Sequence, residues 1–429
     1  MKMRRMFVGL ALLLLIAGFA FASGEQEGSA GSAGGEQDLR ILWWGGQARH
    51  EKTLEVVDMY QGSKEGVTVE PEYLGWSGYW DRLAVLAAAD DMPDVVQMVI
   101  ERLPQYDDRG LLMDLNEVPG FDASILSEGL QEAGSVDGKL VAACLGTNAY
   151  ALAYNPDLFD QAGVDYPTVE WTWDDVAAAS KVFREKLDIY GMNAFSADND
   201  FLYWIRQHGG QLYSDDLSTV GWDDDQIVVD FFEQILDWQE KRYIPPAEYQ
   251  IQNRSNEENS LYAQGEAAMM LMWSNKVVSV RKTLGKDSNL MVLPGPNNEQ
   301  GMYLRPSMFF SISSATDVPE PAGDFVDYFL TDDDANLVLN ADRGVPIVSS
   351  VRETLKENAD SQNVKIFDYI ALVSEHSSPM DTNFPSNEAE LNDTFDQIVE
   401  QVSFGEISPD EGAQRLREEW TTILGRQAQ

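Results

Sequence analysis

The sequence predicts an α/β protein with two lobes, and three observations lead to this prediction. The chain has 429 residues, which suits two or three domains of about 100 to 200 residues better than one. Hydrophobic residues make up 44% of the chain and include 11 Trp, 16 Tyr and 18 Phe, enough to fill sizeable cores. Predicted strands and helices alternate along the chain, as in βαβ units with a mainly parallel sheet.

The N-terminal segment has the features of a secretory signal. Three basic residues within Met1–Arg5 precede an apolar run over residues 6–22, which ends in Ala-Phe-Ala, a small-x-small form that a signal peptidase accepts. We expect cleavage after Ala22 and a periplasmic protein; the alternative is a retained membrane anchor, because the run is near the lower length limit for spanning a bilayer. Residues 23–37 are rich in Gly, Ser, Glu and Gln and are predicted to be a flexible linker.

Folding is expected to start near Asp38, and the first part of the chain predicts one α/β lobe. Short apolar runs indicate strands, and apolar residues at helical spacing indicate helices. The expected elements are a strand at 39–43, a helix at 51–60, a strand at 67–72, a helix at 78–89 and a strand at 94–98. Ligands bind beyond the carboxyl ends of strands in open sheets of this kind. The segments that follow the first and third strands are therefore expected to carry function.

The middle of the chain predicts a second lobe, because predicted strands and helices are again found there. Amphipathic patterns predict helices at 173–187 and 230–239, and an apolar run at 267–273 predicts a strand followed by a helix at 274–284. No internal repeat links the two halves.

Charge and motif content exclude several functions. The chain has 30 Lys and Arg against 72 Asp and Glu, a formal net charge of −42, and such a field repels nucleic acid and anionic lipid. The common nucleophile, phosphate-binding and metal-binding motifs do not occur, and the three His are scattered. Cys144 has no partner for a disulfide and lies among apolar residues, which predicts a buried side chain. We therefore expect no catalytic residues, no metal and no cofactor.

Aromatic residues beside polar ones recur in segments predicted to be loops. The five clusters are Trp43-Trp44-Gly-Gly, Trp76-Ser-Gly-Tyr79-Trp80, Trp171-Thr-Trp173, Tyr203-Trp204 and Trp273-Ser-Asn275. Pyranose rings have apolar faces that stack on indole and phenol, and their hydroxyls need fixed donors and acceptors. The clusters predict a sugar-binding lining; the alternative for each single Trp is a place in a core.

Several stretches resemble the family 1 extracellular solute-binding proteins of ABC importers, the group that includes maltodextrin-binding protein. They include LRILWWGGQARHEKT, GEAAMMLMWSN and RGVPIVSSVRE, and a Tyr-Asn pair that leads to Leu-Phe-x-x-Ala-Gly and then to Trp-Thr-Trp-Asp. The resemblance runs from about Leu39 to the C-terminal helix. It implies the two-lobed periplasmic binding protein fold (type II), with the ligand cleft between the lobes. By this resemblance the N-terminal lobe covers 38–147 plus 293–343, and the C-terminal lobe covers 148–292 plus 344–429.

The same resemblance implies a function and a site. The protein would capture a carbohydrate, an oligosaccharide, and deliver it as a monomer to the permease subunits of an ABC transporter in the inner membrane. Implied ligand-binding residues are Trp44, Gly46, Arg49, Trp76, Tyr79, Gln97, Glu101, Asn148, Trp173, Trp204, Trp273, Ser274, Asn275, Arg305 and Arg343.

Three alternatives stay open at this point. An exported glycoside hydrolase or polysaccharide lyase would share the signal, the aromatics and the carboxylates. A binding protein of the same fold could take a non-sugar solute. The WWGG-x-x-R opening resembles a subgroup associated with plant-type and uronic oligosaccharides, and arginines bind carboxylates well. The acidic surface, however, does not attract an anionic sugar. A neutral or mixed oligosaccharide is therefore slightly favoured.

Overall fold

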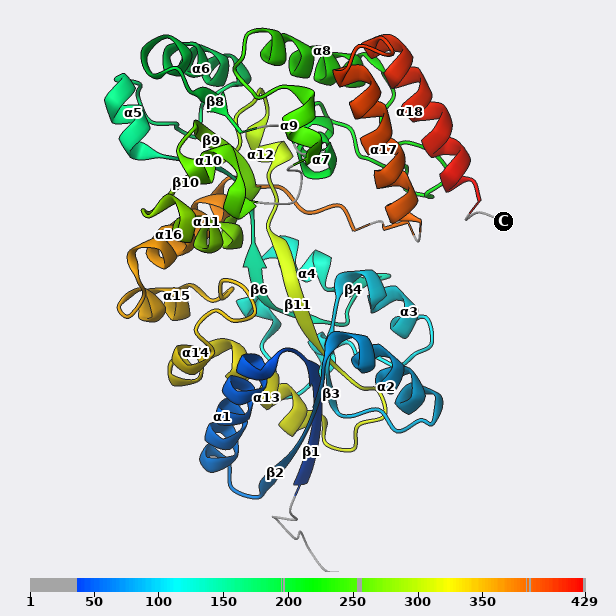
Figure 1. Ribbon diagram of the computed structural model, residues 1–429. Helices are drawn as coiled ribbons and strands as arrows, with labels where there is room; N and C mark the ends of the chain where they lie inside the picture. The colour runs from blue at the N-terminus through cyan, green and yellow to red at the C-terminus, as the bar shows by residue number, and fades with distance from the viewer. Residues whose placement is uncertain are drawn as a thin grey trace, which may run out of the picture. The chain divides into compact units, whose positions relative to one another are not determined.

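The computed structural model describes residues 37–426 apart from 194, 196, 253–256, 383 and 386. The chain from Gln37 onward forms one compact unit. Its buried hydrophobic residues separate into two cores, one for each lobe (Figure 1). The predicted signal at 1–22 and residues 23–36 of the predicted linker lie outside the described residues, whereas Gln37, expected as the last linker residue, begins the first strand. Among the helices that are described, none has the length and apolarity needed to cross a membrane.

The first lobe is built around a five-stranded sheet with the strand order β2-β1-β3-β11-β6. Helices α1, α13 and α14 lie on one side of this sheet and α2 and α3 on the other (Figure 1). Its main elements are β1 (Gln37–Trp44), α1 (Gln47–Ser63), β2 (Val67–Leu74), α2 (Trp76–Ala88), β3 (Val95–Met98), η1 (Ile100–Arg102), α3 (Leu103–Asp107), α4 (Glu128–Ala133), β4 (Ser135–Val136), β5 (Lys139–Leu140), β6 (Ala143–Asn148), β11 (Arg305–Ile312), α13 (Pro319–Thr331) and α14 (Asp333–Leu339).

The second lobe is built around a four-stranded sheet with the order β10-β7-β9-β8. Its elements are β7 (Tyr150–Tyr154), α5 (Pro156–Ala162), α6 (Trp173–Leu187), β8 (Tyr190–Met192), α7 (Ala197–Gln207), α8 (Gln226–Glu240), α9 (Ala247–Gln252), α10 (Leu261–Gln264), β9 (Ala267–Trp273), η5 (Ser274–Lys276), α11 (Val277–Leu284), β10 (Asn289–Met291), α12 (Asn298–Gly301), α15 (Ser349–Lys356), α16 (Ser361–Glu375), α17 (Glu388–Ser403) and α18 (Pro409–Leu424).

Local signals explain where the helices begin and end. At the start of α6, the Thr172 side chain accepts a hydrogen bond from the Asp175 backbone N–H, and the Asp175 carboxylate accepts one from the Thr172 N–H at 2.8 Å. This capping box stabilises a helix start by about 1 kcal/mol. At α5, Asn155 caps the N-terminus and Gly163 ends the helix with φ 64°, a left-handed conformation that glycine adopts without steric cost.

The expected strands at 39–43, 67–72, 94–98 and 267–273 are present with small changes in their bounds. The sheets, however, are mixed rather than mainly parallel. Strand β1 pairs in parallel with β2 and β3, whereas β11 is antiparallel to β3 and β6, and β7 is antiparallel to β9 and β10. In the first sheet the reason is the chain path: β6 leads out of the first lobe and β11 leads back into it, so the two strands run in opposite directions.

The segments that cross between the lobes are packed against one another. Thr147 and Val345 exchange two backbone hydrogen bonds of 2.8 and 3.0 Å, and the Ser307 hydroxyl donates to the carbonyl oxygens of Gly146 and Arg343. A Cβ at position 146 would lie 2.5 Å from the Arg343 carbonyl oxygen. Only glycine therefore fits at this crossing.

The second crossing differs from the expected boundary at residue 293. Leu293 and Met302 belong to the core of the second lobe, and Phe309 belongs to the core of the first. The chain therefore returns to the first lobe after Met302, because residues 293–302 pack on the second lobe before β11 begins.

Candidate ligand-binding site

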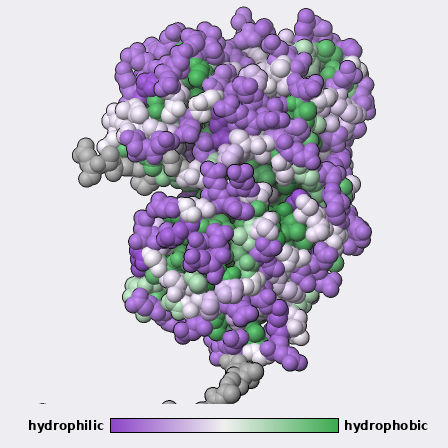
Figure 2. Space-filling view, turned by 180° about the vertical axis from the view of Figure 1, so that it is seen from behind, coloured by the Kyte–Doolittle hydropathy of each residue, from purple (hydrophilic) through white to green (hydrophobic). Residues whose placement is uncertain are grey.

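A cavity of about 770 Å³ lies where the two lobes meet. Seen from behind, the surface is hollowed at this level and apolar side chains gather there (Figure 2). The first lobe contributes the end of β6, the start of β11 and the segment after α14. The second lobe contributes α7, the end of β9, the segments around 303 and 380, and parts of α16, α17 and α18. The volume falls within the range of about 300 to 1,000 Å³ that is usual for small-ligand sites.

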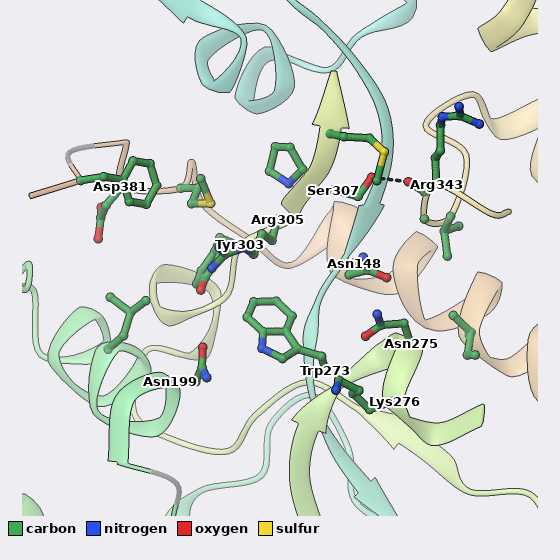
Figure 3. Close-up of a pocket in the computed structure, with 18 of the residues that line it drawn as sticks. Asn148, Asn199, Trp273, Asn275, Lys276, Tyr303, Arg305, Ser307, Arg343 and Asp381 are labelled. Atoms are coloured by element: carbon green, nitrogen blue, oxygen red, sulfur yellow. Dashed lines mark hydrogen bonds between the residues drawn. The ribbon is translucent and has the colours of Figure 1, made fainter. Parts of the chain in front are cut away.

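Trp273 lies in the middle of this cavity (Figure 3). It is the last residue of β9, whose preceding residues are mostly buried, and its ring packs against Tyr150 at 5.3 Å and Tyr303 at 6.3 Å between centroids. The Arg305 guanidinium lies 5.5 Å from the Trp273 ring centroid. A partly exposed indole held in this way is a platform on which an apolar ring face can stack.

Amide side chains surround the indole. Asn148 at the end of β6, Asn275 in η5 and Asn199 in α7 lie around Trp273, with Lys276 beside Asn275 (Figure 3). Amides offer both donors and acceptors. The combination of one aromatic platform with several amides suits a ligand that has apolar faces and hydroxyl edges.

The arginines of the cavity lie in ion pairs. Arg49 Nε lies 2.6 Å from Asp342 Oδ2, Arg206 Nη1 lies 2.6 Å from Asp381 Oδ1, and Arg305 Nη2 lies 3.6 Å from Glu101 Oε1. Lys276 Nζ lies 3.3 Å from Glu257. The walls therefore present compensated charges, in contrast to the excess of acidic residues over the whole chain.

Two smaller hollows adjoin the cavity on the first lobe, with volumes of about 490 and 470 Å³. Both are lined by Trp44 and Trp76, and they share Arg49 or Arg305 with the larger cavity. Trp76 is 53% exposed and meets Trp44 edge-on with 5.2 Å between ring centroids. Trp76 thus offers an open apolar ring beside the first platform, and Trp44, which is 6% exposed, supports it from the core of the first lobe.

Comparison with known proteins connects this architecture to a family. Residues 55–365 match the model for bacterial extracellular solute-binding proteins. The chain belongs to this family. The resemblance found in the sequence is thereby confirmed.

Relatives of this solute-binding protein share its length and fold. The diacetylchitobiose-binding protein DasA of Streptomyces coelicolor is 22% identical over 354 residues, which is 79% of each chain. A family 1 extracellular solute-binding protein of Alicyclobacillus acidocaldarius has a structure that matches with a TM-score of 0.86 at 25% identity, over 92% of this chain and 100% of that one. A periplasmic oligogalacturonide-binding protein of Yersinia enterocolitica matches with a TM-score of 0.75 at 23% identity, over 91% and 99% of the two chains. These matches confirm the two-lobed α/β fold.

The solute-binding protein brings many of the expected site residues to the lobe junction. Arg49, Asn148, Trp273, Asn275, Arg305 and Arg343 line the large cavity. Trp44, Gly46, Trp76 and Glu101 line the adjoining hollows. Their role in binding a ligand stays a prediction.

Three expected residues lie behind the cavity wall instead of on it. Tyr79 and Gln97 are fully buried; the Tyr79 hydroxyl donates to the Gln97 carbonyl oxygen at 2.5 Å, and Gln97 Nε2 donates to the Trp44 carbonyl oxygen at 3.2 Å. The Ser274 hydroxyl is also buried and accepts from the Ala149 N–H. They support the wall because each hydrogen bond fixes a backbone segment that reaches the cavity.

Trp173 and Trp204 are placed in the core of the second lobe, which corrects their expected position in the cleft. They are 8% and 6% exposed, and their indole N–H groups donate to Gln207 Oε1 and to the Ile227 carbonyl oxygen. Both lie on amphipathic helices, whose apolar face packs inward. The Tyr203-Trp204 pair was expected in a loop, whereas it lies inside α7.

Arg343 reaches the cavity, but its guanidinium points away from the centre (Figure 3). Nε donates to Gln97 Oε1 and Nη2 to the Thr53 hydroxyl, both at 2.9 Å. Burial, and next the charge of Arg49, lower the pKa of this guanidinium to about 9. Arg343 therefore ties the crossing segment to the first lobe rather than presenting a free cation to the cavity.

Sequence reasoning missed several residues of the lining. They include Asn199, Arg206, Lys276, Tyr303, Met380 and Asp381. Lys276 directly follows the predicted Trp-Ser-Asn cluster and could have been included. Arg206 and Asp381 carry no local signal, because 174 residues of intervening chain separate them and only the fold pairs them.

Proposed function

We propose that this solute-binding protein captures an oligosaccharide between its lobes and delivers it to the permease of an ABC importer. The observation that carries the proposal is the partly exposed indole of Trp273 surrounded by Asn148, Asn199 and Asn275 in a cavity of about 770 Å³. Relatives named for diacetylchitobiose and oligogalacturonide binding support the same ligand class. Their role as binding proteins also supports a transport component rather than a hydrolase or lyase.

A neutral or mixed oligosaccharide is the proposed ligand. Arg49, Arg206 and Arg305 each lie beside a carboxylate, so a uronic acid would have to compete with groups already in place. A sugar hydroxyl can form hydrogen bonds with these arginines and carboxylates while they stay paired.

A thermal-shift screen tests the ligand class. Chitooligosaccharides, maltodextrins and oligogalacturonides of two to six residues are compared, together with a set of peptides and polyols. A ligand at 100 times its dissociation constant adds about 2.7 kcal/mol to the free energy of unfolding, so the cognate series should raise the melting temperature clearly. Stabilisation by peptides or polyols alone would contradict the proposal, as would shortened products in the incubated sugar.

Export is part of the same proposal, since the family is extracellular. We propose cleavage after Ala22, which leaves Ser23 as the first residue of a monomeric periplasmic protein. Mass spectrometry of the mature chain gives its first residue, and an intact segment 6–22 in the membrane fraction would restore the anchor alternative.

A further inference from the structure

The cavity between the lobes does not end at Trp273 but continues into the second lobe. Beyond the segment 377–382 its lining includes residues from α17, from α18 and from the chain after α7; these are Tyr213, Glu388, Asn392, Phe395 and Trp420. Helices α17 and α18 lie side by side, with α7 next to α17 (Figure 1). We name this part of the cavity the side arm. None of its five residues was expected at the site from the sequence.

Aromatic rings form the floor of the side arm. Phe201 of α7 and Phe395 of α17 stack with 4.5 Å between ring centroids. The Trp420 ring of α18 lies 6.0 Å from Phe395 and 5.6 Å from Tyr213, and its indole N–H donates to the Leu391 carbonyl oxygen at 3.0 Å, which ties α18 to α17. Phe201, Phe395 and Trp420 are each 1% exposed. The floor is therefore apolar and closely packed.

Tyr213 places an unpaired hydroxyl in the side arm. The residue lies in a hairpin over residues 211–221 and is 8% exposed. Its hydroxyl forms no hydrogen bond to any residue that the structure describes, and it is not among the unpartnered polar atoms that are closed off from solvent. The oxygen therefore reaches the open space of the cavity. Because a buried hydroxyl without a partner costs free energy and is uncommon in proteins, this group is a candidate ligand contact.

Helix α17 adds polar groups to the side arm. Glu388, Asn392 and Phe395 all line it, and their spacing of four and three residues places them on one face of the helix. The Asn392 amide, like the Tyr213 hydroxyl, forms no hydrogen bond within the part of the chain that the structure describes. Glu388 is exposed in the first turn of α17. The side arm thus combines an apolar floor with hydrogen-bonding groups that can pair with a ligand.

The charge of the side arm favours an uncharged ligand group. Burial, and next the charge of Glu388, raise the pKa of the Tyr213 hydroxyl, so this hydroxyl stays protonated at neutral pH and can donate. Arg206, a cation of the adjoining lining, is already paired with Asp381 at 2.6 Å. A carboxylate in the side arm would therefore meet the charge of Glu388 without a free cation from Arg206, whereas a sugar hydroxyl can accept from Tyr213 and pair with either end of the Asn392 amide.

We propose that the side arm is a subsite for an uncharged sugar unit, in which the Tyr213 hydroxyl donates to a sugar oxygen and the Asn392 amide bonds to a sugar hydroxyl. The inference rests on the proposed function, because it places part of an oligosaccharide in the side arm. A chain stacked on Trp273 extends into the second lobe by this route, as well as towards the hollows beside Trp76. The second lobe then binds more of the chain than the one ring on Trp273.

Tyr213→Phe tests the hydroxyl and keeps the ring that packs on Trp420. The melting temperature of the ligand-free protein should not fall, because no hydrogen bond within the protein is lost. Titration calorimetry uses the hexasaccharide of the neutral series found in the thermal-shift screen. We expect it to bind about fivefold more weakly than to the unchanged protein, which corresponds to the loss of one hydrogen bond.

The matched control is Tyr262→Phe in the same lobe. Tyr262 is fully buried and lies outside the cavity lining, and its hydroxyl donates to Ser288 Oγ at 2.7 Å. Loss of this internal bond should lower the melting temperature and leave the sugar affinity of the folded protein unchanged. The two tyrosines are therefore expected to give opposite results, which a merely structural role of Tyr213 would not produce.

A second variant tests whether the sugar enters the side arm at all. Asn392→Trp puts an indole into the space that the sugar unit needs, so the hexasaccharide should bind about tenfold more weakly or worse. Its control is Gln397→Trp, which adds the same side chain to α17 at an exposed position outside the cavity lining. The control should change the affinity by less than about twofold. A circular dichroism melt checks that both variants are folded.

The outcomes separate the subsite from the proposed function. Weaker binding in both Tyr213→Phe and Asn392→Trp, with both controls unchanged in affinity, supports the subsite. If the unchanged protein binds a neutral oligosaccharide and Tyr213→Phe binds it equally well, the subsite is overturned and the proposed function stands. Binding of oligogalacturonides alone overturns the uncharged unit. If no saccharide of any series binds to the unchanged protein, the proposed function fails and the subsite fails with it.

Discussion

Tryptophans at the ends of strands and tryptophans on helices occupy different environments in this protein. Trp273 ends β9 and lines the cavity, whereas Trp204 lies within α7 and is 6% exposed. In the sequence both stand beside other aromatic or polar residues, so they look alike. The difference follows from geometry: the carboxyl ends of these strands face the lobe junction, while an amphipathic helix turns its aromatic face to the core.

The first lobe shows the same rule with one variation. Trp44 ends β1, and Trp76 is the first residue of α2. Both line hollows at the lobe junction, but Trp44 is as buried as Trp204 and belongs to the core of the first lobe, so only Trp76 has an open ring. Trp173 is also the first residue of a helix, yet it is buried. A position at a helix start is therefore not enough; the strand that precedes the helix must end at the cleft, as β2 does for Trp76.

The largest expected effect is on the helix side of this comparison. Trp204→Ala should lower the free energy of unfolding by about 3 to 5 kcal/mol, because it leaves a cavity in the second core and removes the hydrogen bond to the Ile227 carbonyl oxygen. Urea unfolding followed by circular dichroism measures it. Sugar affinity of the folded fraction should be near that of the unchanged protein, and a selective loss of affinity would return Trp204 to the binding site.

The matching change at a strand end should act on affinity instead. Trp273→Ala removes the apolar platform and should weaken oligosaccharide binding by about 1 to 3 kcal/mol, or roughly 5- to 150-fold. The free energy of unfolding should decrease less than in Trp204→Ala. Titration calorimetry beside a melting curve decides between them, with Trp273→Phe as the control that keeps a smaller ring. Affinity close to that of the unchanged protein would contradict the stacking role.

A smaller effect is expected at the outer platform. Trp76 is 53% exposed, so Trp76→Ala should change the free energy of unfolding by no more than about 0.5 kcal/mol. Binding of a hexasaccharide should weaken by about fivefold, the loss of one partial stacking contact, and binding of a disaccharide should not change. Equal losses for both sugars would place Trp76 beside the first sugar ring rather than at the far end of the chain.

The smallest effect is expected at Cys144, which compares the buried middle of a strand with the end of the same strand at the cavity. Asn148 at the end of β6 lines the cavity, while Cys144 is buried within the strand, and burial raises the pKa of its thiol to about 12. Iodoacetamide at pH 8 should therefore leave the native protein unmodified, with or without sugar, and label it after denaturation. Because an unfolded thiol ionises near pH 8.5, its ionisation lowers stability as the pH rises above that value. Labelling of the native protein would show that β6 opens locally.

Much of the fold could be predicted because it depends on local patterns. The apolar run at 267–273 is β9, and the helix predicted at 173–187 is α6, which begins beside a capping box. The mixed direction of the sheets could not be read from such patterns. In the first sheet it depends on β11 returning from the other lobe, about 160 positions along the chain from its partner β6.

The candidate site divides in the same way. The sequence identified Trp273 and Asn275 because an aromatic and an amide stand at the end of an apolar strand, and it identified Asn148 through the family resemblance. All three residues line the cavity. Gln97 was also expected there but lies behind the wall, and Arg343 reaches the cavity but turns its guanidinium away to donate to Gln97. A polar residue near a strand end can face the ligand or support a neighbour, and the choice depends on partners that are distant in sequence.

By itself, the sequence determined the α/β class, the two lobes and the place of Trp273 at a strand end, because strand and helix periodicity and the residues after a strand act over a few positions. The family followed from the resemblance of whole stretches of sequence. Only the tertiary structure decided which tryptophans are core, that the arginines of the cavity are already paired, and that Arg206 meets Ser378 and Asp381 in the segment after α16. Those outcomes depend on packing and on charges brought together from segments far apart. A sequence pattern of a few residues does not show which distant segments come into contact in the folded protein.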